Sequence, residues 1–420
     1  MERCKGSRDL LPEDMLRFRY IEQAFRSCCL EWGYKEIRTP SLEYLHLFTS
    51  TGTLTPSILN SVYSFLDWDG WSGERVVLRP DGTIPAVRLY IDNLQESCQA
   101  KLFYIENTFN FEETGQKSRE RWQCGVEMIG YDRPSADIEL ISLALETLSK
   151  LNIEGAELYL SHAGLVKALL QEVGLSPVEQ SQVLERILDG DTEVLKNTIS
   201  DNPQLGDSTS LLFELKGKSP GFLENLKAAL GKVSPDLEKS IENFINITHL
   251  LSEMGCEYQI DIASARGFEY YTGIIFQLYL GEIKIGGGGR YNNLVPLLGG
   301  GNVPASGFAL YIDQLMNSLP IQNWDNDRQM VIVKGNFDSA GEWKLSLEVA
   351  RFLRELGYIV ELDQDSKETN GYRWVLIIRS GEKPSFILTD QASGISTGTE
   401  SPAGILSILQ ETKANEAGSS

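Results

Sequence analysis

Residues 266–273 read Arg266-Gly267-Phe268-Glu269-Tyr270-Tyr271-Thr272-Gly273 and lie among short runs rich in β-branched and aromatic residues. Those runs predict strands at 258–261, 273–279 and 282–285. A run of four glycines, residues 286–289, follows the third strand. By propensity this run fits a turn that needs positive φ, and the alternative is a functional stretch beside a ligand. Long strands separated by long insertions predict an antiparallel α+β sheet and not a regular βαβ array.

The strand-rich pattern extends upstream of this region. Residues 101–111 and 121–130 predict two strands joined by a polar loop. The charge-rich stretch 163–254 has a helical pattern and interrupts two strand-rich blocks. We therefore expect one core domain over residues 1–325 with a helical insertion at about 163–254.

A second, smaller domain is predicted after a boundary near residue 325. Residues 330–334 and 358–362 have strand patterns, and the helix predicted at 343–356 lies between them. We expect a small α/β domain over residues 328–412, followed by a frayed tail at 413–420.

The composition excludes several classes of protein. Lys and Arg number 38 and Asp and Glu 59, so the formal net charge is −21. Because phosphate binding depends on Lys and Arg, this acidity argues against a broad tRNA-binding surface. No apolar run approaches the ~18 residues of a membrane span, and the first residues lack a signal-peptide pattern. Six cysteines without a CxxC pair and three dispersed histidines predict reduced thiols, no metal site and a cytoplasmic protein.

Four polar clusters carry the chemistry that the sequence offers. They are the segment 79–83 at a predicted strand end, the strand segment 123–127, and the stretches 266–273 and 286–291. The strand period of two places Gln123, Gly125 and Glu127 on one face, where Gly125 is expected to leave room for a ligand. Together the clusters supply carboxylates for an ammonium or imidazolium, a guanidinium for a carboxylate, and aromatic walls. An amino-acid pocket requires these groups.

Each cluster also has a purely structural interpretation. Tyr270 and Tyr271 fit ordinary sheet packing, Asp81 fits a plain turn, and Arg266 fits a surface ion pair worth little. The glycine-rich stretch matches neither GxGxxG nor GxxxxGK[ST], so no Rossmann or P-loop nucleotide site is predicted.

In this order the four clusters resemble the catalytic core of histidyl-tRNA synthetase, a class II aminoacyl-tRNA synthetase. Residues 266–273 are similar to its RGLDYYTG signature, and residues 78–83 to its LRPEGT segment. The resemblance covers about residues 5–320 and implies the antiparallel class II core of that family. The other matching elements are 6–12, the dimer-forming motif 1 at 34–40, a QxGxE element at 123–127, and the stretches 288–291 and 304–309.

The resemblance implies which residues would bind histidine. One of them departs from the family pattern. Asp81 stands where the family has Glu, so the side chain that carries the carboxylate is one methylene shorter. The implied histidine-binding residues are Asp81, Thr83, Gln123, Glu127, Arg266, Tyr270, Tyr271 and Tyr291.

The ATP side of the site departs more strongly. The synthetase carries an FRxE arginine on the α-phosphate, and here Asn110 stands in its place. Motif 3 of the family ends in an arginine on the γ-phosphate, and here Gln314 stands in its place. Because adenylate formation depends on fixed cations, losing such an arginine costs on the order of 10³-fold by analogy with arginine fingers. We therefore expect a site that binds histidine, with no catalytic residue and no cofactor.

The second domain resembles a reduced anticodon-binding domain. Its usual lysine-rich region is shortened to residues 364–370, so a scaffold or oligomer contact is favoured over tRNA binding. The whole pattern resembles a paralogous family, the regulatory subunits of ATP phosphoribosyltransferase. That resemblance implies a homodimer through the core, a hetero-octamer with the short catalytic subunit, and feedback inhibition of histidine biosynthesis by histidine.

Two other functions remain as alternatives. One is an active histidyl-tRNA synthetase, and the other is an amide ligase or transferase on a synthetase-like core. Both need ATP activation and therefore the phosphate cations that are missing at Asn110 and Gln314.

Overall fold

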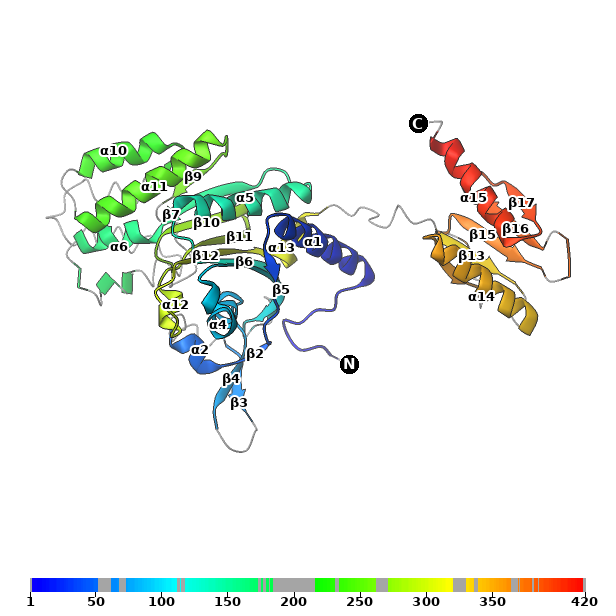
Figure 1. The fold of residues 1–420 in the computed structure, drawn as a ribbon, viewed down its shortest axis with the longest axis horizontal. Coiled ribbons are helices and arrows are strands. Elements are labelled where there is room, and N and C mark those ends of the chain that lie inside the picture. The colour runs from blue at the N-terminus through cyan, green and yellow to red at the C-terminus, as the bar shows by residue number, and fades with distance from the viewer. Residues whose placement is uncertain are drawn as a thin grey trace. The chain divides into compact units, whose positions relative to one another are not determined.

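The chain divides into two compact units, Met1–Pro320 and Ile321–Ser420 (Figure 1). The predicted boundary at 325–328 lies outside the described residues. The structure is a computed structural model that describes residues 2–51, 62–67, 73–111, 114, 118–172, 175–176, 179–180, 182–183, 216–230, 234–261, 271–319, 330–335, 339–363, 369, 371–379, 381–383 and 385–417.

A nine-stranded sheet forms the centre of the first unit, within the described residues. Its order is β1-β5-β6-β12-β11-β10-β7-β9-β8, and only β1 with β5 and β7 with β9 pair in parallel. The predicted antiparallel α+β sheet is thereby confirmed. The strands are β1 (Lys35–Glu36), β5 (Ala100–Phe109), β6 (Glu120–Ile129), β7 (Glu157–His162), β8 (Lys216–Gly217), β9 (Gln259–Asp261), β10 (Ile274–Leu280), β11 (Ile283–Arg290) and β12 (Ala305–Tyr311).

Helices cover both faces of this sheet. Figure 1 shows α1 (Pro12–Glu31), α5 (Pro134–Lys150) and α13 (Ile312–Ser318) on one face, and α4 (Thr83–Asn93) on the other. Helix α1 begins with Pro12 and ends before Gly33, whose φ of +80° no other residue adopts easily. The short segments are α2 (Leu45–Thr49), the 3₁₀ turn Gln95–Ser97 and α12 (Leu294–Leu297).

A small antiparallel sheet lies beside α4 and α2. Its order is β2-β4-β3, from β2 (Leu42–Tyr44), β4 (Arg75–Leu78) and β3 (Ser64–Leu66). One face packs into the core through Val77, which is fully buried. Residues 79–83, the first predicted polar cluster, lead from the end of β4 into the first residue of α4.

The helices predicted within 163–254 are α6 (Ala163–Glu172), α10 (Pro220–Leu230) and α11 (Pro235–Glu253). Helix α11 begins at Ser234, whose Oγ accepts a hydrogen bond from the amide of Leu237. None of the helices in the described part of the chain is long and apolar enough to cross a bilayer.

Among its described residues, the second unit contains a five-stranded sheet in the order β14-β13-β15-β16-β17. It contains β13 (Met330–Lys334), α14 (Ala340–Glu355), β14 (Ile359–Leu362), β15 (Trp374–Ile378), β16 (Phe386–Asp390), β17 (Ser396–Thr399) and α15 (Pro402–Ala417). Its core is built from Val331, Leu353, Leu376 and Ile405. Helix α15 continues to Ala417, into the stretch where we expected a tail, because Ala, Glu and Lys are good helix formers.

Candidate functional site

The Glu127 carboxylate is the centre of a cluster on the α4 side of the large sheet. Its Oε1 accepts a hydrogen bond from the Tyr104 hydroxyl at 3.1 Å, and its Oε2 accepts one from the Tyr291 hydroxyl. The Tyr104 hydroxyl accepts a bond from Gln123 Nε2 at 3.4 Å. We call this the Glu127 cluster; it consists of Asp81, Thr83, Tyr104, Gln123, Glu127, Tyr271 and Tyr291.

Strand register places glycines next to Glu127. Gly307 on β12 pairs with Glu127, and Gly289 on β11 pairs with Gly307, so the three share one face of the sheet. A Cβ at Gly307 would lie 2.8 Å from the Tyr291 hydroxyl oxygen, and one at Gly289 would lie 3.0 Å from Tyr271 Cε1. The glycines therefore leave this face to the two tyrosines and the carboxylate.

The four-glycine run is part of β11 and not a turn. All four residues pair with both β10 and β12, and none has positive φ. The turn interpretation is therefore wrong. Glycine is required here by the space between neighbouring strands, since a Cβ at Gly286 would lie 2.7 Å from the Ala309 carbonyl oxygen.

The space beside Gly125 is occupied by a residue that the sequence analysis did not single out. Tyr104 on β5 lies directly opposite Gly125, and a Cβ at Gly125 would overlap the Tyr104 ring. The expectation that Gly125 leaves room for a ligand is therefore wrong, because the space is filled by protein. The alternating pattern of a strand indicates that residues 102, 104 and 106 share one face. Only the strand register shows that Tyr104 lies opposite Gly125.

Asp81 lies where β4 leads into α4 and has a structural contact. Its Oδ1 accepts a hydrogen bond from the amide of Ile84 at 2.8 Å, at the first turn of the helix. Burial raises the pKa of Asp81 to about 6, against the lowering effect of the Ile84 and Thr83 amides. Asp81 therefore caps a helix while its charge lies close enough to affect the pKa values of Glu127 and Tyr271.

Two carboxyl groups thus share an enclosed site. Burial raises the pKa of Glu127 to about 8, and the hydrogen bonds from Tyr291, Thr83 and Tyr104 only partly oppose that effect. Among the residues that the structure describes, neither Asp81 nor Glu127 forms an ion pair with Lys, Arg or His. Buried carboxylates without a basic partner are unfavourable, so the site suits a ligand that brings a cation or hydrogen-bond donors.

Six of the eight predicted histidine-binding residues lie together in the structure. Asp81, Thr83, Gln123, Glu127 and Tyr291 lie together as described above, and Tyr271 joins them, with its ring centroid 6.4 Å from that of Tyr291. Arg266 and Tyr270 lie outside the described residues.

Two arginines near the site serve the fold. Arg79 is buried and bonds Glu106 at 2.6 Å as well as the Asn107 carbonyl oxygen at 2.7 Å. Arg290 is buried against Asp137 at 3.0 Å. Their guanidinium groups are occupied by these partners.

The positions of the missing phosphate arginines hold neutral side chains. Asn110 follows β5, with its amide bonded to the Arg119 carbonyl oxygen at 2.9 Å, and Gln314 lies in the first turn of α13. An exposed arginine lies nearby, because Arg121 on β6 lowers the pKa of both Tyr311 and Asp313, which burial raises. No motif in the sequence points to Arg121 as a cation beside the site.

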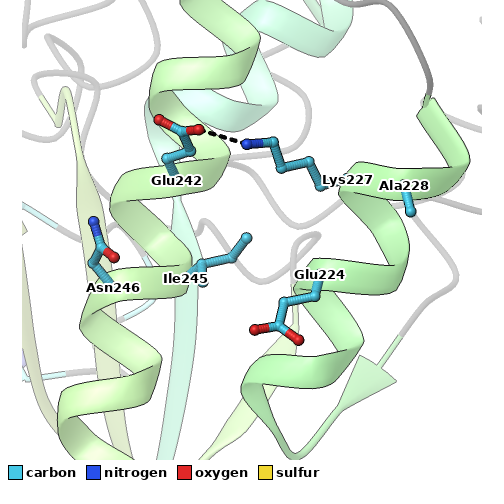
Figure 2. A pocket seen from close by; sticks show the side chains of 6 residues that line it. All are labelled: Glu224, Lys227, Ala228, Glu242, Ile245 and Asn246. Carbon is cyan, nitrogen blue, oxygen red and sulfur yellow. Dashed lines mark hydrogen bonds and ion pairs between the residues drawn. The ribbon is translucent and has the colours of Figure 1, made fainter.

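A separate groove of about 670 Å³ lies between α10 and α11 (Figure 2). Lys227 on α10 bonds Glu242 on α11 at 2.5 Å across it, as the dashed line shows. Ile245 and Asn246 also line this groove. Its charged groups pair with each other in solvent, so it offers less chemistry than the Glu127 cluster. No group of three or more metal-ligating side chains occurs within the described ranges.

Comparisons with known proteins define the class of this fold and site. The family model described as histidyl-tRNA synthetase matches residues 6–315, so the first unit is a class II synthetase-like core. A solved structure from Bacillus halodurans, titled an ATP phosphoribosyltransferase regulatory subunit/histidyl-tRNA synthetase, superposes with a TM-score of 0.76 at 25% identity. It covers 90% of this chain and 97% of that chain.

Sequence relatives give the particular family. The ATP phosphoribosyltransferase regulatory subunit of Dehalococcoides mccartyi is 48% identical over 97% of this chain and 98% of its own length. The histidine–tRNA ligase of Methanosarcina acetivorans is 37% identical over 76% of each chain. The chain belongs to the family of ATP phosphoribosyltransferase regulatory subunits, on the histidyl-tRNA synthetase fold.

Proposed function

We propose that this chain is a regulatory subunit of ATP phosphoribosyltransferase. In this role it assembles with the short catalytic subunit, is required for that subunit's activity in the first step of histidine biosynthesis, and mediates inhibition by histidine. The proposal is supported by the 48% identity to a regulatory subunit over nearly the whole of both chains. The chain functions in the cytoplasm, where that pathway operates.

The Glu127 cluster supports histidine as the ligand. Its two carboxyl groups have no basic partner among the described residues, and histidine carries both an ammonium and an imidazole. The tyrosine hydroxyls donate to Glu127, so the oxygens of the cluster face a ligand mainly as acceptors. An acceptor-rich site selects a ligand rich in donors.

We propose further that the chain does not aminoacylate tRNA. Asn110 and Gln314 cannot supply the fixed positive charge that phosphoryl transfer chemistry needs. Arg121 is the observation that favours the alternative, an active synthetase, because it is a cation at the edge of the site. Histidine-dependent ATP–pyrophosphate exchange tests that alternative, and we expect no exchange above background.

A homodimer through the core is supported by an exposed apolar face on the small sheet. Tyr44, Val76 and Phe65 lie in one row across β2, β4 and β3. Tyr44 and Phe65 are 43% and 46% exposed, and Leu42 on the same face is 49% exposed. Aromatic side chains left in solvent on a sheet face are typical of a protein–protein contact. We propose that a second copy covers this face and that two such dimers join four catalytic subunits in the hetero-octamer.

One assay tests the main proposal. The chain is mixed with a short-form catalytic subunit, and formation of phosphoribosyl-ATP is measured with and without histidine. We expect a stimulated rate that histidine suppresses. Histidine must therefore bind the low-activity assembly more tightly than the active one, since equal affinity shifts no equilibrium. Co-elution of the two chains without stimulation would reduce the proposal to a structural partnership.

A further inference from the structure

The helical insertion is joined to the Glu127 cluster at the start of α6. The amide of Ala163 donates to the Gly273 carbonyl oxygen at 2.8 Å, two residues after Tyr271. A Cβ at Gly164 would lie 3.0 Å from the Thr272 carbonyl oxygen and 3.0 Å from Ser240 Oγ of α11. Helix α6 therefore lies close against the segment that carries Tyr271, and α11 packs against the start of α6.

His162 fixes this junction. Its Nδ1 accepts a hydrogen bond from the amide of Leu165 at 3.0 Å, and its Nε2 lies 3.2 Å from Asn243 Oδ1. Burial lowers the pKa of His162 to about 4, so the ring is neutral and Nε2 carries the hydrogen. The junction between α6 and α11 therefore has a defined geometry at neutral pH.

One lysine reaches from the insertion toward the site. Lys167 on α6 is half-buried, and its Nζ donates to the Tyr271 carbonyl oxygen at 3.5 Å. Burial lowers the pKa of Lys167, and among the described residues no carboxylate lies within ion-pair distance of it. A half-buried ammonium whose partner in the described part of the chain is a carbonyl oxygen does not stabilise a fold well, which points to a functional role.

We propose that Lys167 is a positioning residue for the ligand site: it holds the main chain at Tyr271 and so couples the helical insertion to ligand binding. The proposal rests on the proposed histidine site. It adds a residue on an element that contributes no side chain to the Glu127 cluster.

The contacts around Tyr271 explain why one hydrogen bond matters there. On the β11 side, the amide of Thr272 donates to the Arg290 carbonyl oxygen at 2.7 Å, and the Gly273 amide reaches the same oxygen at 3.4 Å. Lys167, on α6, donates to the carbonyl oxygen of Tyr271 itself. Without it, residues 272 and 273 keep their bonds to β11 and to the Ala163 amide, but the Tyr271 carbonyl group loses its bond to α6, and the Tyr271 ring is held less firmly beside Tyr291.

Substitution of Lys167 separates this role from ordinary structural support. Lys167→Met keeps the length of the side chain and removes the charge, and Lys167→Arg keeps a donor. Lys150→Met, at the end of α5, is a matched control that also removes one lysine charge, since Lys150 pairs with Glu31 and Glu146 away from the site. Histidine affinity is measured by calorimetry and thermal unfolding by circular dichroism, on the full chain.

We expect Lys167→Met to bind histidine about tenfold more weakly while its melting temperature stays the same or rises, because a half-buried charge is removed. Lys167→Arg should recover part of the affinity, and Lys150→Met should bind like wild type. Unchanged affinity in Lys167→Met, or affinity lost only in proportion to stability, overturns the proposal.

Hydrogen exchange of the ligand-free chain gives a second readout that does not need histidine. In Lys167→Met the amides of Thr272 and Gly273 should exchange several-fold faster than in wild type, with other core strands unchanged. Failure of wild type to bind histidine would reject the proposed ligand but leave this measurement valid. Equal exchange rates in the two proteins would reject the role of Lys167 itself.

Discussion

Gly125 and Tyr104 face each other across β6 and β5, and the absence of a side chain at Gly125 is what allows the Tyr104 hydroxyl to reach Glu127. The pair therefore determines the hydrogen bonding of the Glu127 carboxylate. Both residues lie in the middle of long antiparallel strands, so this geometry belongs to the rigid sheet and not to a loop.

Gly125→Ala should displace the Tyr104 ring and break its hydrogen bond to Glu127. We expect histidine affinity to fall at least tenfold, together with a loss of stability of about 1–3 kcal/mol from overpacking. Calorimetry and denaturant unfolding measure the two effects. Gly221→Ala in α10, where the nearest side-chain atom is 3.9 Å away, is the control; it should leave histidine affinity unchanged and should not destabilise the chain, since Ala is the better helix former. Wild-type affinity in Gly125→Ala would show that Tyr104 is not needed for binding.

The raised pKa of Glu127 makes stability depend on pH. The folded chain holds a proton on Glu127 that the unfolded chain releases between pH 4.5 and about 8. The free energy of unfolding should therefore fall as pH rises through this window. Glu127→Gln removes the effect, so the variant should gain on wild type toward pH 8, by on the order of 1.4 kcal/mol for each unit of pKa shift. Denaturant unfolding at pH 5, 6.5 and 8 measures the difference.

Asp81→Asn provides a comparison in which stability should change over a lower pH range. Because the pKa of Asp81 is raised from 3.8 to about 6, its effect should level off by about pH 7, with no further change at pH 8. A constant difference between Glu127→Gln and wild type across all three pH values would contradict the linkage.

Glu106→Ala should be strongly destabilising, because it leaves the buried Arg79 guanidinium without its partner at 2.6 Å. We expect a loss of about 3–5 kcal/mol in the free energy of unfolding. The comparison is Glu36→Ala, which removes a partly exposed partner of Arg26 at 2.9 Å and should cost no more than about 1 kcal/mol. Similar losses in the two variants would mean that burial does not set the strength of these pairs.

The exposed face of the small sheet predicts a change of oligomeric state. Tyr44→Glu combined with Phe65→Glu places two charges on a face that we propose a second copy covers, and the dimer should dissociate. Sedimentation velocity measures the mass in solution. Ile395→Glu in the second unit is the control, because Ile395 is 64% exposed but lies on a different unit. A dimer that survives the double substitution would place the contact elsewhere.

Periodicity was sufficient to predict much of the fold. The helical pattern within 163–254 corresponds to α6, α10 and α11, and the period of two placed Gln123 and Glu127 on one strand face. These features depend on residues near each other in the sequence. These features can therefore be predicted without knowing which strands pair.

Cross-strand relationships could not be predicted in the same way. The role of Tyr104 depends on its being opposite Gly125, which is a matter of register between β5 and β6. Residues 286–289 were predicted to form a turn because glycine has a low propensity for strands. Their extended conformation follows from the pairing of β11 with two neighbours, which no local propensity encodes.

The described large sheet ends in two very short strands, β1 (Lys35–Glu36) and β8 (Lys216–Gly217). Each offers only a couple of unpaired backbone groups, and β1 carries charged side chains. A broad sheet with such blunt margins is protected from adding foreign strands and polymerising. Assembly into larger complexes must then use side-chain surfaces. A few substitutions can change such a surface without affecting the hydrogen bonds between the strands.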